Sequence, residues 1–213
     1  MRKILICTLL MFCAITFSVS QNNSKIRETN AKQDQQVISI LKEMTALQSQ
    51  ITSAQNSQTK AEAWLNLNRK ADALAVRMTD LLRETRDSGP LVPTDDLNRV
   101  ADKSAALGIS VNYCEIGTDW AANFVGYENY FKLWPDGPNA DEAYWKSKVE
   151  ANACGDFEGT LEEYQQGIER YSDFIKRFPN SSYTERAKSQ LEAYQAGLRE
   201  EQKRQANPAN AHN

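Results

Sequence analysis

The chain has 213 residues, a formal net charge of −3 at pH 7 and a quarter of its residues charged. This length suits one domain, or a small domain with an extension. The charges of both signs are interspersed, which excludes the basic surface that nucleic-acid binding requires, so no nucleic-acid partner is expected.

Residues 1–20 have the pattern of a secretory signal peptide. Arg2 and Lys3 precede an apolar run over residues 4–17, and small residues occupy positions −3 and −1 before Gln21. The apolar run is short for a membrane span. We therefore expect an exported protein, periplasmic or secreted, with no stable membrane span after cleavage. An uncleaved membrane anchor is the alternative.

Two apolar seams follow residues 21–36, a polar segment that we expect to be flexible. Each seam has apolar residues three and four apart, as on one face of a helix, and a polar break separates them. Thr59 with Glu62 predicts a capping box at the start of the second helix. The seams comprise Val37, Ile40, Met44, Leu47, Ile51 and Ala54, then Trp64, Leu67, Ala71, Leu74, Met78 and Leu81.

The two seams predict an antiparallel helical hairpin over residues 37–88. The alternative is one long helix in an intermolecular coiled coil, which would make the protein a homo-oligomer. Residues 89–117 are predicted to form a linker of one helix and a loop. Thr94 is expected to cap that helix, which runs to about Leu107, and the stretch from Gly108 onward is expected to be a loop with at most one extended segment. The helices in residues 59–107 are alternatively degenerate repeat units.

An aromatic phrase that ends in proline occurs twice within residues 118–201, with Pro135 and Pro179 lying 44 residues apart. Thr118 and Asp119 are expected to cap the first helix of the first copy. A recurrence of this length is typical of stacked helical pairs that bury each other's faces. The predicted packing residues are Tyr127, Trp134, Pro135 and Ala143, repeated as Tyr171, Phe178, Pro179 and Ala187.

The two copies resemble tetratricopeptide repeats (TPRs), particularly those of bacterial envelope proteins such as the β-barrel assembly lipoprotein and the coordinator of the Tol–Pal system. The resemblance rests on residues 130–144 and 171–183. Each has an aromatic-rich helix, a Trp-Pro or Phe-Pro stop, a short polar turn, and a second helix with a small residue, Ala143 or Ala187. The period exceeds the usual 34 residues, and we place the additional residues in the loop over 154–160. The resemblance implies a short helical stack that binds or scaffolds protein partners in a bacterial periplasm.

Two cysteines remain once Cys7 and Cys13 leave with the signal peptide, namely Cys114 and Cys154. An exported chain with two cysteines is expected to pair them. The repeat also places both before the second helix of consecutive units, which stacking would bring together. We therefore predict a Cys114–Cys154 disulfide, with two free thiols as the alternative.

Catalytic chemistry has little support in the sequence. The only histidine, His212, lies in the polar tail of residues 202–213, which is expected to be disordered, and no glycine-rich phosphate loop occurs. No enzyme activity, metal or cofactor is therefore expected.

Three aromatic residues are the candidate partner-binding side chains, because the repeat constrains them least: Trp120, Tyr144 and Trp145. Aromatic anchors in a helical groove bind peptide or helix segments. Packing against the N-terminal hairpin is their alternative role. The sequence as a whole predicts an all-α protein, a hairpin or coiled coil followed by a TPR-like stack. Its expected function is non-catalytic protein binding or scaffolding in the bacterial cell envelope. The alternatives are a coiled-coil coordinator of envelope assembly and an enzyme accessory.

Overall fold

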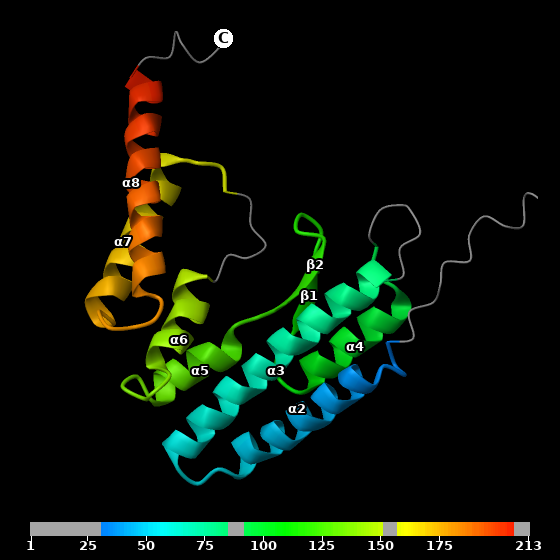
Figure 1. The fold of residues 1–213 in the computed structure, drawn as a ribbon. Coiled ribbons are helices and arrows are strands. Elements are labelled where there is room, and N and C mark those ends of the chain that lie inside the picture. Colours follow the sequence, from blue (N-terminus) through cyan, green and yellow to red (C-terminus); the bar gives the residue numbers. More distant parts are fainter. Residues whose placement is uncertain (1–30, 85–91, 151–156, 207–213) are drawn as a thin grey trace, which may run out of the picture.

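A computed structural model describes residues 31–84, 92–150 and 157–206. Its elements are helices apart from one small two-stranded sheet, so the predicted all-α class is confirmed. Figure 1 shows a bundle of the helices α2, α3 and α4, which carries the sheet, and an upright pair of helices, α7 and α8, which we call the arm. The predicted signal peptide, residues 1–20, lies outside the described residues.

The first two helices of the bundle, α2 (Gln35–Ser53) and α3 (Ser57–Glu84), form a hairpin within one chain. The predicted seams pack against each other, and Met44, Leu74 and Met78 are completely buried. The segment expected to be flexible ends earlier than predicted, because Ala31 is buried and Asp34 caps α2. The α3 helix begins at Ser57 rather than after Thr59, since the Asn56 side chain accepts the Thr59 N–H at 2.8 Å.

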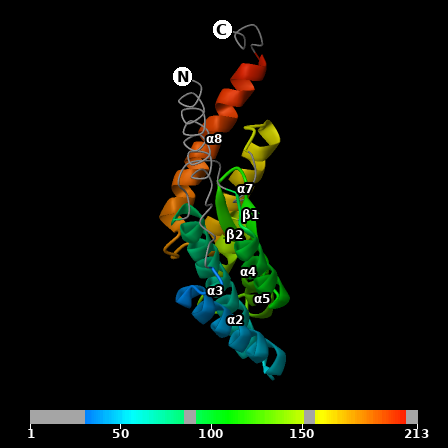
Figure 2. The same cartoon turned by 90° about the vertical axis from the view of Figure 1, so that its right-hand side faces the viewer.

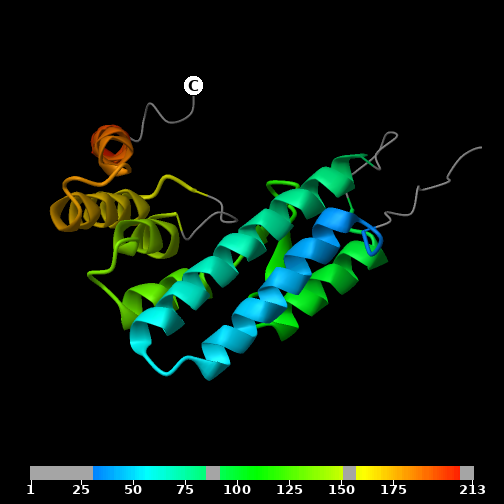
Figure 3. The same cartoon turned by 60° about the horizontal axis from the view of Figure 1, so that its bottom comes forward.

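The third helix of the bundle, α4 (Asp95–Ala106), runs beside the first two, as Figure 3 shows. Thr94 caps it as predicted by accepting the Leu97 N–H. Leu97 and Val100 enter the same core as the seams of α2 and α3. The helix therefore belongs to the bundle and is more than a linker.

The two strands, β1 (Val111–Cys114) and β2 (Asp119–Ala122), form an antiparallel hairpin in which Cys114 lies opposite Asp119. The expectation that Thr118 and Asp119 cap a helix is wrong, and the helix begins only at Val125. The physical reason is a tertiary contact. The Trp120 backbone N–H donates to Thr79 Oγ1 of α3 at 2.8 Å, and the Trp120 indole enters the bundle core. Contacts of this kind outweigh local helix signals.

The α3 helix has a second buried face, which binds the segment from β2 to the next helix, α5 (Val125–Leu133). The Asn68 side chain accepts the Gly126 N–H at 2.8 Å and donates to the Asn123 carbonyl at 3.0 Å. A Cβ on Gly126 would lie 2.5 Å from the Trp64 carbonyl oxygen, so only glycine permits this close approach. The α3 helix is therefore central, with α2 on one side and α5 and the sheet on another.

The rest of the chain holds the two copies of the aromatic phrase. After α5 come α6 (Ala140–Tyr144), the π-helical segment η1 (Trp145–Val149), α7 (Leu161–Arg177) and α8 (Thr184–Ala206). Both turns make the same backbone hydrogen bonds 44 residues apart. Those of the first are Trp134–Tyr130, Gly137–Trp134, Ala140–Gly137 and Ala143–Asn139, and those of the second are Phe178–Phe174, Ser181–Phe178, Thr184–Ser181 and Ala187–Tyr183. The repeated phrase therefore has one backbone conformation in both copies.

The two copies pack through their aromatic side chains. Tyr144 contacts Phe131 of its own copy and Phe174 and Phe178 of the next. Among the predicted packing residues, Tyr127, Ala143 and Ala187 are buried, whereas Trp134, Tyr171 and Phe178 are half-buried at the edges of the clusters. Pro135 and Pro179 are exposed, so they end the helices rather than pack between them.

The arm consists of α7 and α8, and α8 continues beyond α7 in Figure 2. Two glycines allow two tyrosine rings to pack directly against the helix backbone. A Cβ on Gly167 would lie 2.0 Å from the Tyr194 ring, and one on Gly197 would lie 2.2 Å from the Tyr164 ring. The tail predicted to be disordered from residue 202 is helical through Ala206. Ion pairs three residues apart, such as Lys203–Glu200, support this extension.

Candidate functional site

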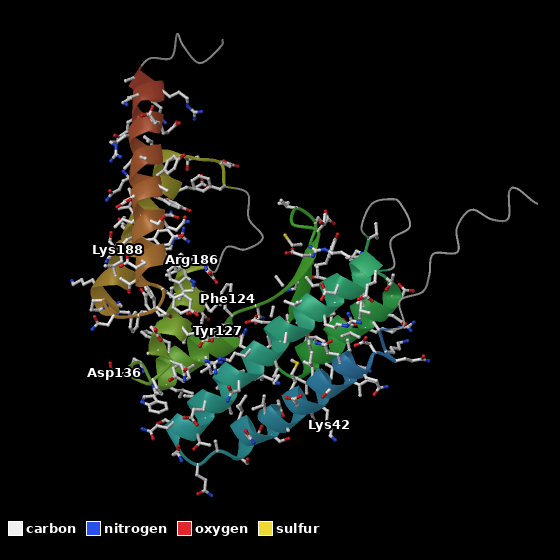
Figure 4. All side chains as sticks on the ribbon, in the orientation of Figure 1. Lys42, Phe124, Tyr127, Asp136, Arg186 and Lys188 are labelled. Carbon is white, nitrogen blue, oxygen red and sulfur yellow. The ribbon has the colours of Figure 1, made fainter. Side chains whose placement is uncertain are left out.

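A cleft of about 800 Å³ lies between the bundle and the arm. Its walls come from α3, the β-hairpin and α5 on one side, and from η1, α7 and α8 on the other. In Figure 4, Arg186 of α8, Tyr127 of α5 and Phe124, which directly precedes α5, lie in the angle between the two parts. The site therefore joins segments that are far apart in the sequence.

Two exposed apolar side chains line this cleft from different elements. Val76 of α3 is 62% exposed, and Phe157, which precedes α7, is 54% exposed. The Phe157 ring packs edge-on against Tyr164 and Tyr194, with centroids 5.2 and 5.5 Å apart. Apolar surface of this kind within a concave site is typical of a binding surface.

An ion-pair network occupies the part of the cleft formed by η1. Glu150 accepts Lys146 Nζ at 2.6 Å and Arg186 Nη1 at 2.8 Å, and the Arg186 guanidinium lies 5.2 Å from the Trp145 ring. Burial opposes ionisation of Glu150, but the hydrogen bond from Lys146 and the nearby positive charges outweigh it and lower the Glu150 pKa. This network fixes Arg186 across the cleft and links α8 to η1.

A second polar contact lies where α3 meets α5. Asp72 accepts the Tyr127 hydroxyl at 2.5 Å. Burial raises the Asp72 pKa above its ordinary value of 3.8, although the Tyr127 hydrogen bond acts in the opposite direction. Burial, followed by the Asp72 charge, also raises the Tyr127 pKa. The pair has one hydroxyl and one carboxylate that already satisfy each other, so it links α3 to α5.

Arg170 of α7 also lines the cleft, and it differs from the other cations there. Its Nε atom is shielded from water and has no hydrogen-bond partner among the described residues. No ion pair of Arg170 occurs in that part of the chain either, whereas Lys146 and Arg186 both bind Glu150. The cleft therefore contains one guanidinium whose hydrogen-bonding capacity is incompletely used.

The aromatic residues predicted to bind a partner are buried or half-buried. Trp120 is 6% exposed in the bundle core, which fits the alternative of packing against the N-terminal helices. Trp145 is 1% exposed and stacks on Tyr183 at 5.1 Å. Tyr144 is half-buried and donates its hydroxyl hydrogen bond to Asp173. Both tryptophans lie along the cleft but are held by core packing, so they are not accessible anchors.

Sequence reasoning missed Val76, Phe157 and Arg170. Val76 is an apolar residue off the predicted seam, Phe157 lies in a predicted loop, and Arg170 is one of several charged residues on an amphipathic helix. The one available signal is that Val76 is an apolar residue outside the seam of its helix. Nothing local identifies the other two, because their proximity to α3 depends on how the arm is placed.

The predicted disulfide joins Cys114 to a residue that the structure does not describe. Cys114 lies buried on β1 and lines the cleft, and Cys154 is outside the described residues. The Cys114–Cys154 bridge therefore stays a prediction. Over residues 31–84, 92–150 and 157–206, no cluster of three or more metal-ligating side chains occurs. None of the helices within those ranges has the length and apolar character that crossing a membrane requires.

Comparisons of the chain with protein-family models, with curated proteins and with solved structures gave no match. The cleft and the repeated phrase are therefore the features that indicate a function.

Proposed function

We propose that the protein is a non-catalytic binding or scaffolding module that holds a segment of a partner protein in the cleft between the bundle and the arm. The observation that carries this proposal is the cleft itself, with a volume of about 800 Å³ and exposed apolar side chains, Val76 and Phe157. Binding sites typically combine such an apolar lining with a few polar groups at fixed positions.

The repeated phrase supports the same function. Its two copies share one turn conformation and pack side by side through aromatic contacts, such as Tyr144 with Phe174. Stacked helical pairs form extended concave surfaces that bind other proteins. The resemblance to envelope TPR proteins and the signal-like residues 1–20 extend the proposal to a periplasmic protein with an envelope partner.

The coiled-coil alternative has less support. The seam residues that it would use, including Met44, Leu74 and Met78, are buried within a single chain. An intermolecular coiled coil would have to open the hairpin and expose this core to water. No observation specifically favours an enzyme accessory.

Site-specific photo-crosslinking tests the proposal with two matched positions. Val76, in the cleft, and Ile38, on α2 and away from the cleft, are both exposed apolar residues. Each is replaced in turn by p-benzoylphenylalanine in the full chain, which is then irradiated in an envelope extract of its source cells. We expect a discrete crosslinked protein from position 76 and none from position 38, because only the cleft holds the partner.

Competition with the unmodified protein should abolish the crosslink, and thermal unfolding should be unchanged in both variants. Equal crosslinking from positions 76 and 38, or none from position 76, would contradict the proposal.

A further inference from the structure

The charged side chains that line the cleft differ in whether they have a hydrogen-bond or ion-pair partner. Glu150 binds both Lys146 and Arg186, Asp72 binds the Tyr127 hydroxyl, and Glu163 accepts the Thr160 N–H at 2.9 Å in the capping box of α7. Arg170 alone lacks an anionic partner among the described charged groups that line the cleft. Its Nε is also shielded from water, and a buried donor without an acceptor is unfavourable.

An Arg guanidinium has a particular preferred ligand. Its planar fork of N–H donors matches the two oxygens of a carboxylate, and the bond gains strength where water is excluded. The described acids of the cleft are bound elsewhere, so none of them serves as this acceptor. A carboxylate supplied by a protein ligand matches the unpaired guanidinium of Arg170.

The apolar residues of the cleft add a second requirement. Phe157 is held by Tyr164 and Tyr194, yet more than half of its surface remains exposed, and Val76 is similarly exposed. These side chains and Arg170 line one cleft. A ligand that satisfies both requirements carries an apolar side chain close to its carboxylate.

We infer that the cleft selects a partner segment with an Asp or Glu side chain next to a large apolar residue, with the carboxylate bound by Arg170. This inference rests on the proposed function and specifies the chemistry of the partner. In this inference the carboxylate belongs to a side chain within the segment and not to its C-terminus.

Selection from a random dodecapeptide phage library tests this inference. The immobilised full chain is compared with the Arg170→Gln and Lys176→Gln variants. Lys176 is the matched control, because it is an exposed cation on the same helix but does not line the cleft. We expect enrichment of peptides with Asp or Glu beside Leu, Ile, Phe or Trp. Binding of these peptides should weaken at least about tenfold with Arg170→Gln and remain unchanged with Lys176→Gln.

Two further measurements test how the carboxylate of the peptide is bound. Selected peptides are synthesised with a free and with an amidated C-terminus, and equal affinity is expected for both. Replacing the acidic residue of the peptide by Lys should abolish binding to the natural protein and restore it to the Arg170→Glu variant. Circular dichroism establishes that each variant keeps its helical content.

The outcomes separate the inference from the proposed function. If no peptide is enriched over a blank surface, the cleft is not a peptide site and both fail. Enrichment of peptides without acids, or peptides indifferent to Arg170→Gln, overturns the inference and leaves the binding function standing. Loss of binding on C-terminal amidation alone overturns it in favour of a terminal carboxylate.

Discussion

The bundle and the arm are both helical, but different kinds of side chain hold them together. The bundle has an aliphatic core in which α2, α3, α4 and the β-hairpin bury residues such as Met44 and Leu74 completely. On α7 and α8 the buried residues are Gly167, Phe174, Thr184, Ala187 and Glu201. The arm relies instead on half-exposed aromatic rings, such as Tyr164 and Tyr194.

This difference determines how each part tolerates change. The core of the bundle combines residues of α2, α3, α4 and the β-hairpin, so each of these elements is held by more than one other. The arm is a two-helix layer that joins the rest of the chain mainly through η1, where Trp145 contacts Phe174 and Tyr183. Regions with fewer buried apolar contacts open at lower free energy. We therefore expect the arm to unfold locally before the bundle does.

The largest expected effect comes from Trp145→Ala, which tests whether the arm opens separately. Trp145 is 1% exposed and packs on aromatic rings of the arm, so its removal leaves a large cavity. We expect a loss of about 3–5 kcal/mol in local stability. Hydrogen exchange followed by mass spectrometry should accelerate in α7 and α8 and remain slow in α3. Uniform acceleration would show that the two parts unfold together.

Two glycine substitutions compare the contacts of the two parts directly. Gly to Ala within a helix ordinarily stabilises by about 1 kcal/mol. Here Gly126→Ala would set a Cβ against the Trp64 backbone, which cannot move alone, and we expect a loss of about 3 kcal/mol. Gly167→Ala meets only the Tyr194 ring, which can turn aside, so a loss of about 1–2 kcal/mol is expected. Urea unfolding measures both.

A double variant provides the control for this comparison. Tyr194→Ala removes the ring that Gly167 accommodates, so adding Gly167→Ala to it should cost nothing further. Additive losses in the double variant would mean that the glycine has a role other than seating the ring.

The smallest expected effect is a pH dependence at Asp72. The folded state raises the Asp72 pKa above 3.8, mainly through burial, so the folded protein binds this proton more tightly than the unfolded chain. Stability from this group is therefore fully present below the unfolded pKa and is lost as pH rises through the folded pKa. Relative to Asp72→Asn, the natural protein should gain stability as pH falls from 7 toward 4. Parallel pH profiles from thermal unfolding of the two proteins would contradict this prediction.

Local and periodic signals account for the parts of the fold that could be predicted. Thr94 begins its helix because its hydroxyl binds a backbone N–H three residues away, a contact that the sequence itself contains. The Trp-Pro and Phe-Pro turns are predictable because their residue types recur at a fixed distance. The β-hairpin of β1 and β2 is not predictable in the same way. It depends on the hydrogen bond between Trp120 and Thr79, which lies 41 residues earlier, and no local pattern encodes that contact.

The sequence by itself therefore determined that the segments of α2, α3 and α4 are helical, where the aromatic turns fall and that the two turns are equivalent, because these properties depend on neighbours along the chain. The tertiary structure alone decided that α3 is buried on more than one face, that Trp120 and Trp145 belong to the core, and that Arg170 lies in the same cleft as Val76. These depend on burial against distant elements, and burial is a property of the assembled fold.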